Sequence, residues 1–252
     1  MTGKRPLGSD VRRRVVAGGA MLYDASRAGN LSPEWFEPRL LLERGQAQAV
    51  AAGRGAAWYI DPEGVRWVLR HYRRGGLAAA IASDRYFWQG EEATRPFAEW
   101  QLTYHLHRAG LPVPAPVAAS YRREGCSYRG DLITERLEGV QPLAQCLRAG
   151  ALSLLNWIAI GRCLRRFHDA GACHADLNAH NVLLGDADAV YLVDFDRGSV
   201  RPPGLWRDGN LVRLRRSLEK VCYGLPPEHF TEADWHGLLD GYQLPGAAAA
   251  GG

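Results

Sequence analysis

The stretch HADLNAHNVLL, residues 174–184, places two histidines, an aspartate and two asparagines at short intervals in an otherwise apolar segment. A second stretch, YLVDFDRG at 191–198, ends an apolar run with two further aspartates. Carboxylates and amides in strand-forming sequence are costly to fold unless a cation or a reacting group compensates for them. These residues therefore predict a site that performs chemistry.

The spacing of these side chains matches the kinase catalytic loop, whose pattern is H-x-D-L-x-x-x-N. In such loops the aspartate orients the substrate hydroxyl and the asparagine holds a magnesium ion. His174, Asp176 and Asn181 occupy those places, so we predict Asp176 as the catalytic residue and Asn181 as a metal ligand. Asp194 stands where the D-F-G motif supplies the main magnesium ligand, and we predict it as the second metal ligand.

Two short strands must bring these side chains together. We expect 182–184 and 191–193 to pair across a turn at Gly185 and Asp186, which would return Asp194 beside Asn181. Oxygen ligands would then converge on one hard cation and its phosphates. A lone H-x-D is usually a surface turn and a lone DFD a strand end, but their order and joint spacing favour the catalytic interpretation.

The chain divides near residue 139 into a β-rich part and an α-rich part, which predicts an α+β protein with the two lobes of a protein-kinase-like fold. The predicted parts are an N-terminal extension (1–45), an N-lobe that clamps the nucleotide (46–139), a small C-lobe with the catalytic loop, the metal site and a basic helix (140–244), and a disordered tail (245–252).

A kinase needs a cationic group on the nucleotide phosphates. Gly53 and Gly55 resemble a shortened Gly-rich loop, and Arg70 ends the strand beginning at Trp67, where V-A-I-K would have its lysine. The lysines of the chain are Lys4 and Lys220, and neither suits this place. The clamp therefore falls to Arg70, which shares a strand face with Val68 and Tyr72, or to its neighbours Arg73 and Arg74.

Two acidic residues receive roles in the same lobe. Glu99, in RPFAEWQLTYHL, is the expected partner of Arg70, because the planar guanidinium pairs bidentately with a carboxylate or a phosphate. The alternative for Glu99 is a charge that interacts favourably with the helix dipole. Glu135, in LITERLEG, lies where the chain crosses between the lobes, and we expect its backbone to face the adenine.

Composition narrows the protein class. The five cysteines are scattered, without the spacing of a zinc site, which favours reduced thiols and no structural metal. The apolar run near the N-terminus is short and Gly-rich, which disfavours a cleaved signal peptide. No apolar run approaches the roughly 20 residues that span a bilayer. Nothing points to nucleic acid or to a protein partner.

The positive charge is concentrated in one segment. The formal net charge is +4, yet residues 197–220 alone carry +5, so the rest of the chain sums to about zero. The basic residues there are Arg197, Arg201, Arg207, Arg213, Arg215, Arg216 and Lys220. Arg213, Arg216 and Lys220 share one helical face, which predicts contact with an anionic head group or leaflet; the alternative is a solvated face. We predict Arg197, Arg201, Arg213 and Arg216 as substrate-binding residues.

The motifs HADLNAHN, DFDRG, VLRHYRRGGL, DRYFWQG, RPFAEW and LITERLEG together resemble those of the 3-deoxy-D-manno-octulosonic acid (Kdo) kinases, which belong to the lipopolysaccharide core kinases of protein-kinase-like fold. The resemblance implies transfer of phosphate from ATP, with Mg²⁺, to the 4-hydroxyl of Kdo in a Kdo-bearing lipid A precursor. It also implies a peripheral protein on the cytoplasmic side of the bacterial inner membrane. In this family, the resemblance further implies, an arginine at the clamp position and an aspartate such as Asp196 in place of the D-F-G glycine are usual.

Two alternatives remain. Another sugar or small-molecule kinase of the same fold would carry the same motifs, and a pseudokinase scaffold would bind a partner and transfer nothing. The intact set of Asp176, Asn181 and Asp194 argues against the scaffold. A protein substrate is disfavoured, because no A-P-E segment follows Asp196 and the connection to the basic helix is too short for a peptide shelf.

Overall fold

The computed structural model describes residues 8–50, 57–61, 64–73 and 84–244. The chain forms two compact units. The first unit comprises the described parts of Met1–Tyr104 and Ala115–Arg136, and the second unit those of His105–Pro114 and Leu137–Gly252. The protein is thus a mixed α/β protein, and its chain passes from one unit to the other after Tyr104, Pro114 and Arg136.

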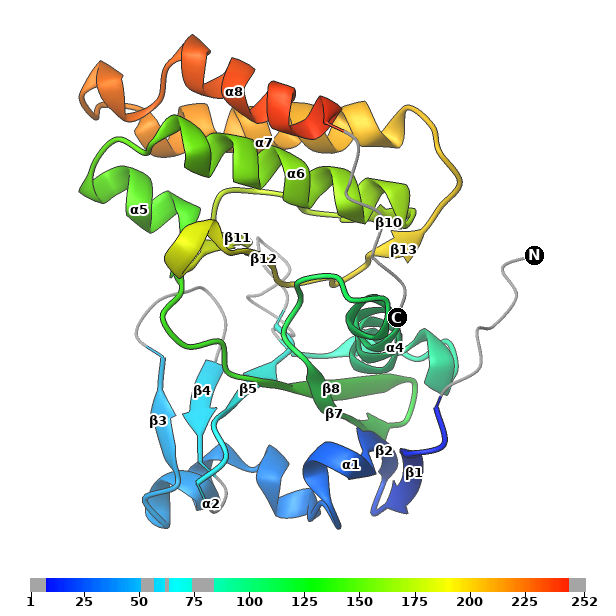
Figure 1. Ribbon diagram of the computed structural model, residues 1–252. Coiled ribbons are helices and arrows are strands. Elements are labelled where there is room, and N and C mark those ends of the chain that lie inside the picture. The colour runs from blue at the N-terminus through cyan, green and yellow to red at the C-terminus, as the bar shows by residue number, and fades with distance from the viewer. Residues whose placement is uncertain (1–7, 51–56, 62–63, 74–83, 245–252) are drawn as a thin grey trace. The chain divides into compact units, whose positions relative to one another are not determined.

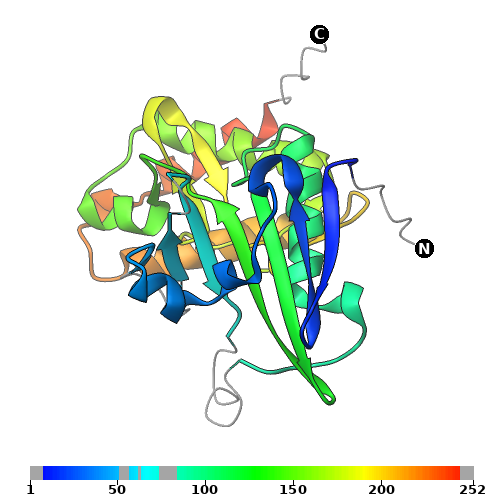
Figure 2. The same ribbon diagram turned by 90° about the horizontal axis from the view of Figure 1, so that it is seen from below.

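The first unit is built on one antiparallel sheet. Its described strands are β1 (Val11–Val16), β2 (Gly19–Asp24), β3 (Ala47–Ala49), β4 (Ala57–Ile60), β5 (Trp67–His71), β6 (Tyr86–Phe87), β7 (Pro116–Glu124) and β8 (Ser127–Glu135). Their order is β1-β2-β7-β8-β5-β4-β3, and β6 pairs with β8. The long β7–β8 hairpin and the β1–β2 hairpin beside it are seen from below in Figure 2.

The predicted N-terminal extension over 1–45 is not a separate segment in its described part. It supplies β1 and β2, then α1 (Ala25–Ala28), the 3-10 turn η1 (Pro33–Phe36) and α2 (Pro38–Glu43). β2 pairs with β7, with Met21 opposite Ser120. Met21, Leu31 and Leu41 are fully buried, so their apolar surface joins this segment to the core of the first unit.

Alternation along β5 and β8 separates two cores, one on each face of the sheet. Tyr72 and Leu132 pack against the first two turns of α4 (Arg95–Arg108) and the residues around them. Trp67 and Ile133 pack on the opposite face, against the segment that contains α1, η1 and α2. The start of α4 lies directly against the sheet. The contact is so close that a Cβ at Gly130 of β8 would lie only 2.6 Å from Pro96 Cγ.

The second unit is mostly helical. Its helices are α5 (Leu143–Ala149), α6 (Leu154–Asp169), α7 (Trp206–Cys222) and α8 (Glu232–Gln243), with 3-10 turns η3 (Asp186–Asp188) and η4 (Pro227–His229). Short strands β9 (Gln141–Pro142), β11 (Val182–Leu184) and β12 (Val190–Leu192) form one sheet, and β10 (Ala172–Cys173) pairs with β13 (Ser199–Val200). In the described part of the chain, no helix has the length and hydropathy needed to cross a membrane.

Helices α6 and α8 pack closely against each other (Figure 1). This packing fixes the position of α6, whose C-terminal end leads toward the catalytic loop. A Cβ at Gly161 would lie 1.9 Å from the carbonyl oxygen of Leu238, and one at Gly241 would lie 2.1 Å from that of Ile158. Only glycine permits this approach of the two backbones. β10 begins three residues after the end of α6 and leads directly into His174.

Candidate active site

His174 anchors the catalytic loop. It is buried, and its Nδ1 accepts a hydrogen bond from the backbone N–H of Asp176 at 3.1 Å. Its Nε2 therefore carries the proton and donates to the carbonyl oxygen of Val193 at 2.9 Å. Burial lowers the pKa of His174, which keeps the imidazole neutral as this pattern requires. One ring thus ties the residue predicted as catalytic to the strand that leads into Asp194.

Two asparagine side chains contact the exposed Asp176. The amide nitrogen of Asn178 donates to the Asp176 carbonyl at 2.9 Å and to its Oδ2 at 3.2 Å. Asn181 Nδ2 donates to the same carbonyl at 3.0 Å. Since this bond uses the amide nitrogen, it leaves Asn181 Oδ1 as the atom suited to a metal ion.

The β11–β12 hairpin returns Asp194 beside Asn181, as the sequence predicts. Val182 pairs with Leu192, and the N–H of Val193 donates to the carbonyl of Asn181 at 3.1 Å. Asp194 follows immediately, exposed, with a left-handed φ of 63°. A non-glycine residue in this conformation is uncommon and is often found where a side chain must be aimed at a ligand.

The donors in this region fit a hard cation. Asn181 and Asp194 offer an amide oxygen and a carboxylate, the ligand type that Mg²⁺ accepts while it keeps several waters. Among the described residues there is no cluster of three or more histidine, cysteine, aspartate or glutamate side chains that could hold a metal ion. All five cysteines are free thiols.

Helix α7 holds the catalytic loop by its backbone. Asn210 Nδ2 donates to the carbonyl of His174 at 2.9 Å, and Ser217 Oγ accepts from the N–H of Ala179 at 3.1 Å. Between them, Arg213 Nη1 donates to the carbonyl of Ala175. Positions 210, 213 and 217 lie on one side of the helix, so a single helix face positions the loop.

The other predicted substrate-binding arginines lie in the second unit but differ in their contacts. Arg197 is exposed and has a φ of 59°, three residues after Asp194. Arg201 is exposed and its Nε donates to Ser199 Oγ at 2.9 Å. Arg216 is exposed on α7, whereas Arg215 pairs with Glu219 and Glu232.

In the first unit, Arg70 pairs with Glu99, as predicted. Glu99 Oε2 accepts from both Arg70 and the hydroxyl of Tyr72. Glu99 is only 4% exposed and lies beyond the first turn of α4, which contains no acidic residue. The ion pair rather than the helix dipole therefore accounts for its position.

The structure gives less information on the other residues predicted to contact the nucleotide. Gly53, Gly55 and Arg74 lie outside the described residues, and Arg73 is exposed. The backbone N–H of Glu135 donates to the carbonyl of Ala115 at 2.9 Å, and its side chain pairs with Arg27. That N–H is already used, so an adenine contact at Glu135 must use another backbone group.

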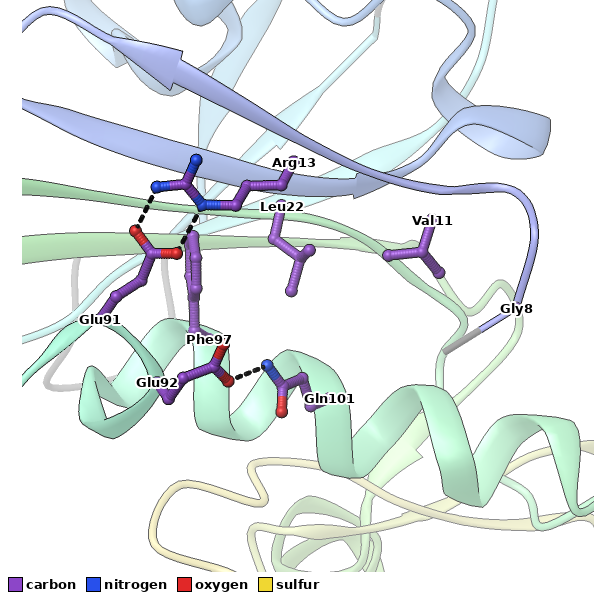
Figure 3. A pocket seen from close by; sticks show the side chains of 8 residues that line it. All are labelled: Gly8, Val11, Arg13, Leu22, Glu91, Glu92, Phe97 and Gln101. Atoms are coloured by element: carbon purple, nitrogen blue, oxygen red, sulfur yellow. Dashed lines mark hydrogen bonds and ion pairs between the residues drawn. The ribbon is translucent and has the colours of Figure 1, made fainter. Parts of the chain in front are cut away.

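A pocket in the first unit contains none of the predicted site residues (Figure 3). At its edge Arg13 forms two hydrogen bonds with Glu91, at 2.6 and 2.8 Å, and Tyr121 donates to the same carboxylate at 2.7 Å. The hydrogen bonds from Arg13 lower the pKa of Glu91, and burial raises the pKa of Tyr121 to about 12. These groups satisfy one another, which is typical of a structural cluster.

Three residues of the site escape the sequence reasoning. Asn178 falls on an unspecified position of the H-x-D-L-x-x-x-N pattern, although its place two residues after Asp176 is a usable signal. Tyr72 shares a strand face with Arg70, so alternation alone suggests its contact with Glu99. Asn210 gives no local signal, because it is one polar residue among many in α7.

Comparison with known proteins gives a consistent picture. The family model for the "Lipopolysaccharide kinase (Kdo/WaaP) family" matches residues 41–242. The chain is 46% identical over 204 residues to a 3-deoxy-D-manno-octulosonic acid kinase of Xylella fastidiosa (strain M23), with 81% of each chain covered. Proteins of the same name from Stenotrophomonas maltophilia (strain R551-3) and Xanthomonas axonopodis pv. citri (strain 306) are 46% and 45% identical, with 81% and 90% of each chain covered.

Proposed function

Because the chain belongs to the lipopolysaccharide kinase (Kdo/WaaP) family, we propose that it is a 3-deoxy-D-manno-octulosonic acid kinase that phosphorylates the 4-hydroxyl of Kdo in a Kdo-bearing lipid A precursor, with ATP as donor. The observation that carries this proposal is the set of contacts around Asp176. Its carboxylate is exposed and held by Asn178, and the paired strands β11 and β12 put Asn181 next to Asp194.

The second unit supplies the acid–base group and the metal ligands of this reaction. Asp176 accepts the hydrogen bond of the acceptor hydroxyl and takes its proton as the oxygen attacks the γ-phosphorus. The bond from that phosphorus to the β–γ bridging oxygen breaks, and ADP leaves. Asn181 Oδ1 and the Asp194 carboxylate hold Mg²⁺, which when bound neutralises charge on the phosphates.

The first unit supplies the cationic clamp, and we assign the two units to the N-lobe and C-lobe of a protein-kinase-like fold. Arg70 binds the nucleotide phosphates, and Glu99 keeps its guanidinium in one orientation. An arginine suits this role because its planar fork satisfies a carboxylate and a phosphate together. The Tyr72 hydroxyl adds a second hydrogen bond to Glu99 and so restricts the carboxylate further.

The acceptor is anionic, and basic residues of the second unit receive it. Arg213 contacts the catalytic loop one residue before Asp176, which suits it to the sugar carboxylate. Arg197, Arg201 and Arg216 are exposed and suit the lipid A phosphates. A lipid-linked acceptor requires the enzyme to work at a membrane surface, and we place it peripherally on the cytoplasmic side of the inner membrane.

Mass spectrometry of a purified Kdo-bearing lipid A precursor tests the proposal. Incubation with the protein, ATP and Mg²⁺ should add one phosphate, and fragmentation should place it on the Kdo 4-hydroxyl. Asp176→Asn, which preserves the shape of the side chain, is the matched control and should add none. Phosphate on another sugar of a mixed panel, but not on Kdo, would indicate a different sugar kinase; nucleotide binding without transfer would indicate a scaffold.

A further inference from the structure

The outer side of α7 carries large apolar side chains that no part of the described chain covers. Leu205, at the N-cap, is 86% exposed, Val212 is 48% exposed and Tyr223, at the C-cap, is 91% exposed. Single exposed apolar residues are common on protein surfaces, but a set of them aligned along one element is not. Their alignment is therefore the feature to explain.

Helical geometry places these side chains in one line. At about 100° per residue, positions 205, 212, 216 and 223 fall within about 40° of one another around the helix axis. From 205 to 223 the line runs about 27 Å. Leu211, Leu214 and Leu218 are buried and occupy the other side of the helix, so α7 is apolar both toward the core and along this outer line.

Positive charge flanks the apolar line. Arg216 lies within it and Lys220 beside it, both exposed. Two acidic residues lie near the line: Glu219 pairs with Arg215 at 3.0 Å, which offsets its charge, and exposed Asp208 lies on the side of the line opposite Lys220. Arg213 differs from Arg216 and Lys220, because its guanidinium is tied to the carbonyl of Ala175 in the catalytic loop. The helical face predicted for Arg213, Arg216 and Lys220 therefore divides in two. Arg216 and Lys220 lie on the outer side of α7, whereas Arg213 contacts the catalytic loop.

We propose that Leu205, Val212 and Tyr223, together with Arg216 and Lys220, form a docking surface for an anionic phospholipid bilayer. This surface is called the α7 stripe below. An apolar line flanked by basic residues is the pattern of a helix that lies in the membrane interface, and tyrosine suits that boundary because its ring is apolar and its hydroxyl polar. The basic residues complement the anionic lipid head groups.

The stripe is related to the catalytic loop by α7 itself. Asn210, Arg213 and Ser217 bind the loop from a side of the helix about a third of a turn from the stripe. A bilayer under the stripe therefore lies along the same rigid helix that positions Asp176. This inference rests on the proposed function only in that a lipid-linked acceptor gives the docking its purpose.

Sedimentation with vesicles tests the proposal. Wild-type protein should bind vesicles of phosphatidylethanolamine and phosphatidylglycerol and should bind phosphatidylcholine vesicles weakly. Leu205→Ser, Val212→Ser and Tyr223→Ser combined should reduce binding at least about tenfold at low and high salt, because buried apolar area is lost. Arg216→Gln with Lys220→Gln should reduce it about thirtyfold at low salt, and the remaining binding should depend less on salt.

A matched control keeps the same kind of substitution away from the stripe. Val15→Ser and Phe87→Ser replace side chains that are 70% and 66% exposed on strands of the first unit, and vesicle binding should not change. Unfolding midpoints of all variants within a few degrees of wild type show that the fold is retained. Wild-type vesicle binding in the triple serine variant overturns the proposal.

Kinetics separate this proposal from the proposed function. The triple serine variant should phosphorylate a water-soluble Kdo glycoside like wild type, while its KM for the lipid-linked acceptor in vesicles should rise about tenfold or more. If wild type phosphorylates neither acceptor, the kinase assignment fails, and the vesicle measurements still decide the docking surface. If both acceptors are phosphorylated equally by wild type and variant, the docking surface is wrong and the kinase assignment stands.

Discussion

The side-chain amide of Asn178 donates to Asp176 Oδ2 at 3.2 Å and to the Asp176 carbonyl at 2.9 Å. Its own Oδ1 accepts from the backbone N–H of His180 at 2.8 Å. Both ends of the amide are thus fixed, and its orientation follows from the backbone on either side. Asn178 therefore acts as a positioning residue that sets the direction of the Asp176 carboxylate without taking part in the chemistry.

Replacement of Asn178 by aspartate should lower kcat by about 10- to 100-fold, because small misplacement of a reacting group is costly. The variant keeps an oxygen for the N–H of His180 but loses the donor to Asp176 and adds a second carboxylate. The KM for ATP should stay within about twofold, because the Asn178 side chain contacts Asp176 and His180 and none of the proposed nucleotide or metal ligands; Asn181 is bound by the Asn178 backbone, which the substitution keeps. Steady-state kinetics at saturating acceptor provide the measurement. Equal losses in kcat and nucleotide affinity would point instead to general disruption of the loop.

Two isosteric substitutions should separate the roles of Asp176 and Asp194. Asp194→Asn removes a charged metal ligand and should weaken nucleotide binding in the presence of Mg²⁺. Asp176→Asn should leave nucleotide binding intact and lower turnover about 10²- to 10⁴-fold, the usual contribution of a positioned acid–base group. Calorimetric titration with a non-hydrolysable ATP analogue, with and without Mg²⁺, measures binding. Near wild-type phosphotransfer by Asp176→Asn would refute its catalytic role.

The catalytic loop and the β11–β12 hairpin follow from the sequence because their determinants are local. The loop pattern fixes Asp176 and Asn181, and the two apolar runs joined at Gly185 fix the register that returns Asp194. The Arg70–Glu99 pair is also predictable, because strand alternation puts Arg70 on one face with Val68 and Tyr72, and a planar guanidinium on that face pairs well with a carboxylate from the helix that follows.

Other features depend on contacts that sequence patterns do not encode. β1 carries three consecutive arginines and has mostly exposed side chains, so it resembles a charged leader rather than an edge strand; its place follows from pairing with β2. Spacing on α7 identifies which residues share a face, but not that Arg213 reaches back to the carbonyl of Ala175. The helical pattern alone therefore says least about the contacts of long, flexible side chains.

The Arg70–Glu99 pair should affect both stability and nucleotide use. Arg70→Ala removes an ion-pair partner from the buried carboxylate of Glu99, which should cost about 3 kcal/mol in free energy of unfolding. It should also raise the KM for ATP and lower turnover. Glu99→Gln should reproduce part of the kinetic defect, because the guanidinium loses its orientation.

The exposed neighbour Arg73 provides the control for this pair, since Arg73→Ala changes the local charge equally but removes no buried contact. Its unfolding free energy and its KM for ATP should stay close to wild type. Denaturant unfolding and initial-rate kinetics on the three variants give both quantities. Full activity in Arg70→Ala together with loss of activity in Glu99→Gln would contradict the proposed pairing.

His168 should make the second unit sensitive to acid. It is 2% exposed near the end of α6, and its Nδ1 lies 2.7 Å from the hydroxyl of Tyr242 on α8. Burial is the main cause that lowers the pKa of His168 to about 4 from its ordinary value of 6.5. Because the folded state holds the proton less tightly than the unfolded state, this group contributes stability above pH 6.5 and loses it as the pH falls toward 4.

The size of this effect is about 3 kcal/mol in the free energy of unfolding, from the difference between the two pKa values. Denaturant unfolding at pH 7 and pH 4 should therefore show a larger loss for wild type than for His168→Gln, which keeps a hydrogen-bonding side chain but cannot be protonated. His174, whose pKa burial also lowers, adds equally to both proteins and cancels in the comparison. His236→Gln, an exposed substitution on α8, should follow wild type at both pH values. An identical loss in wild type and His168→Gln would show that acid acts on the fold through other groups.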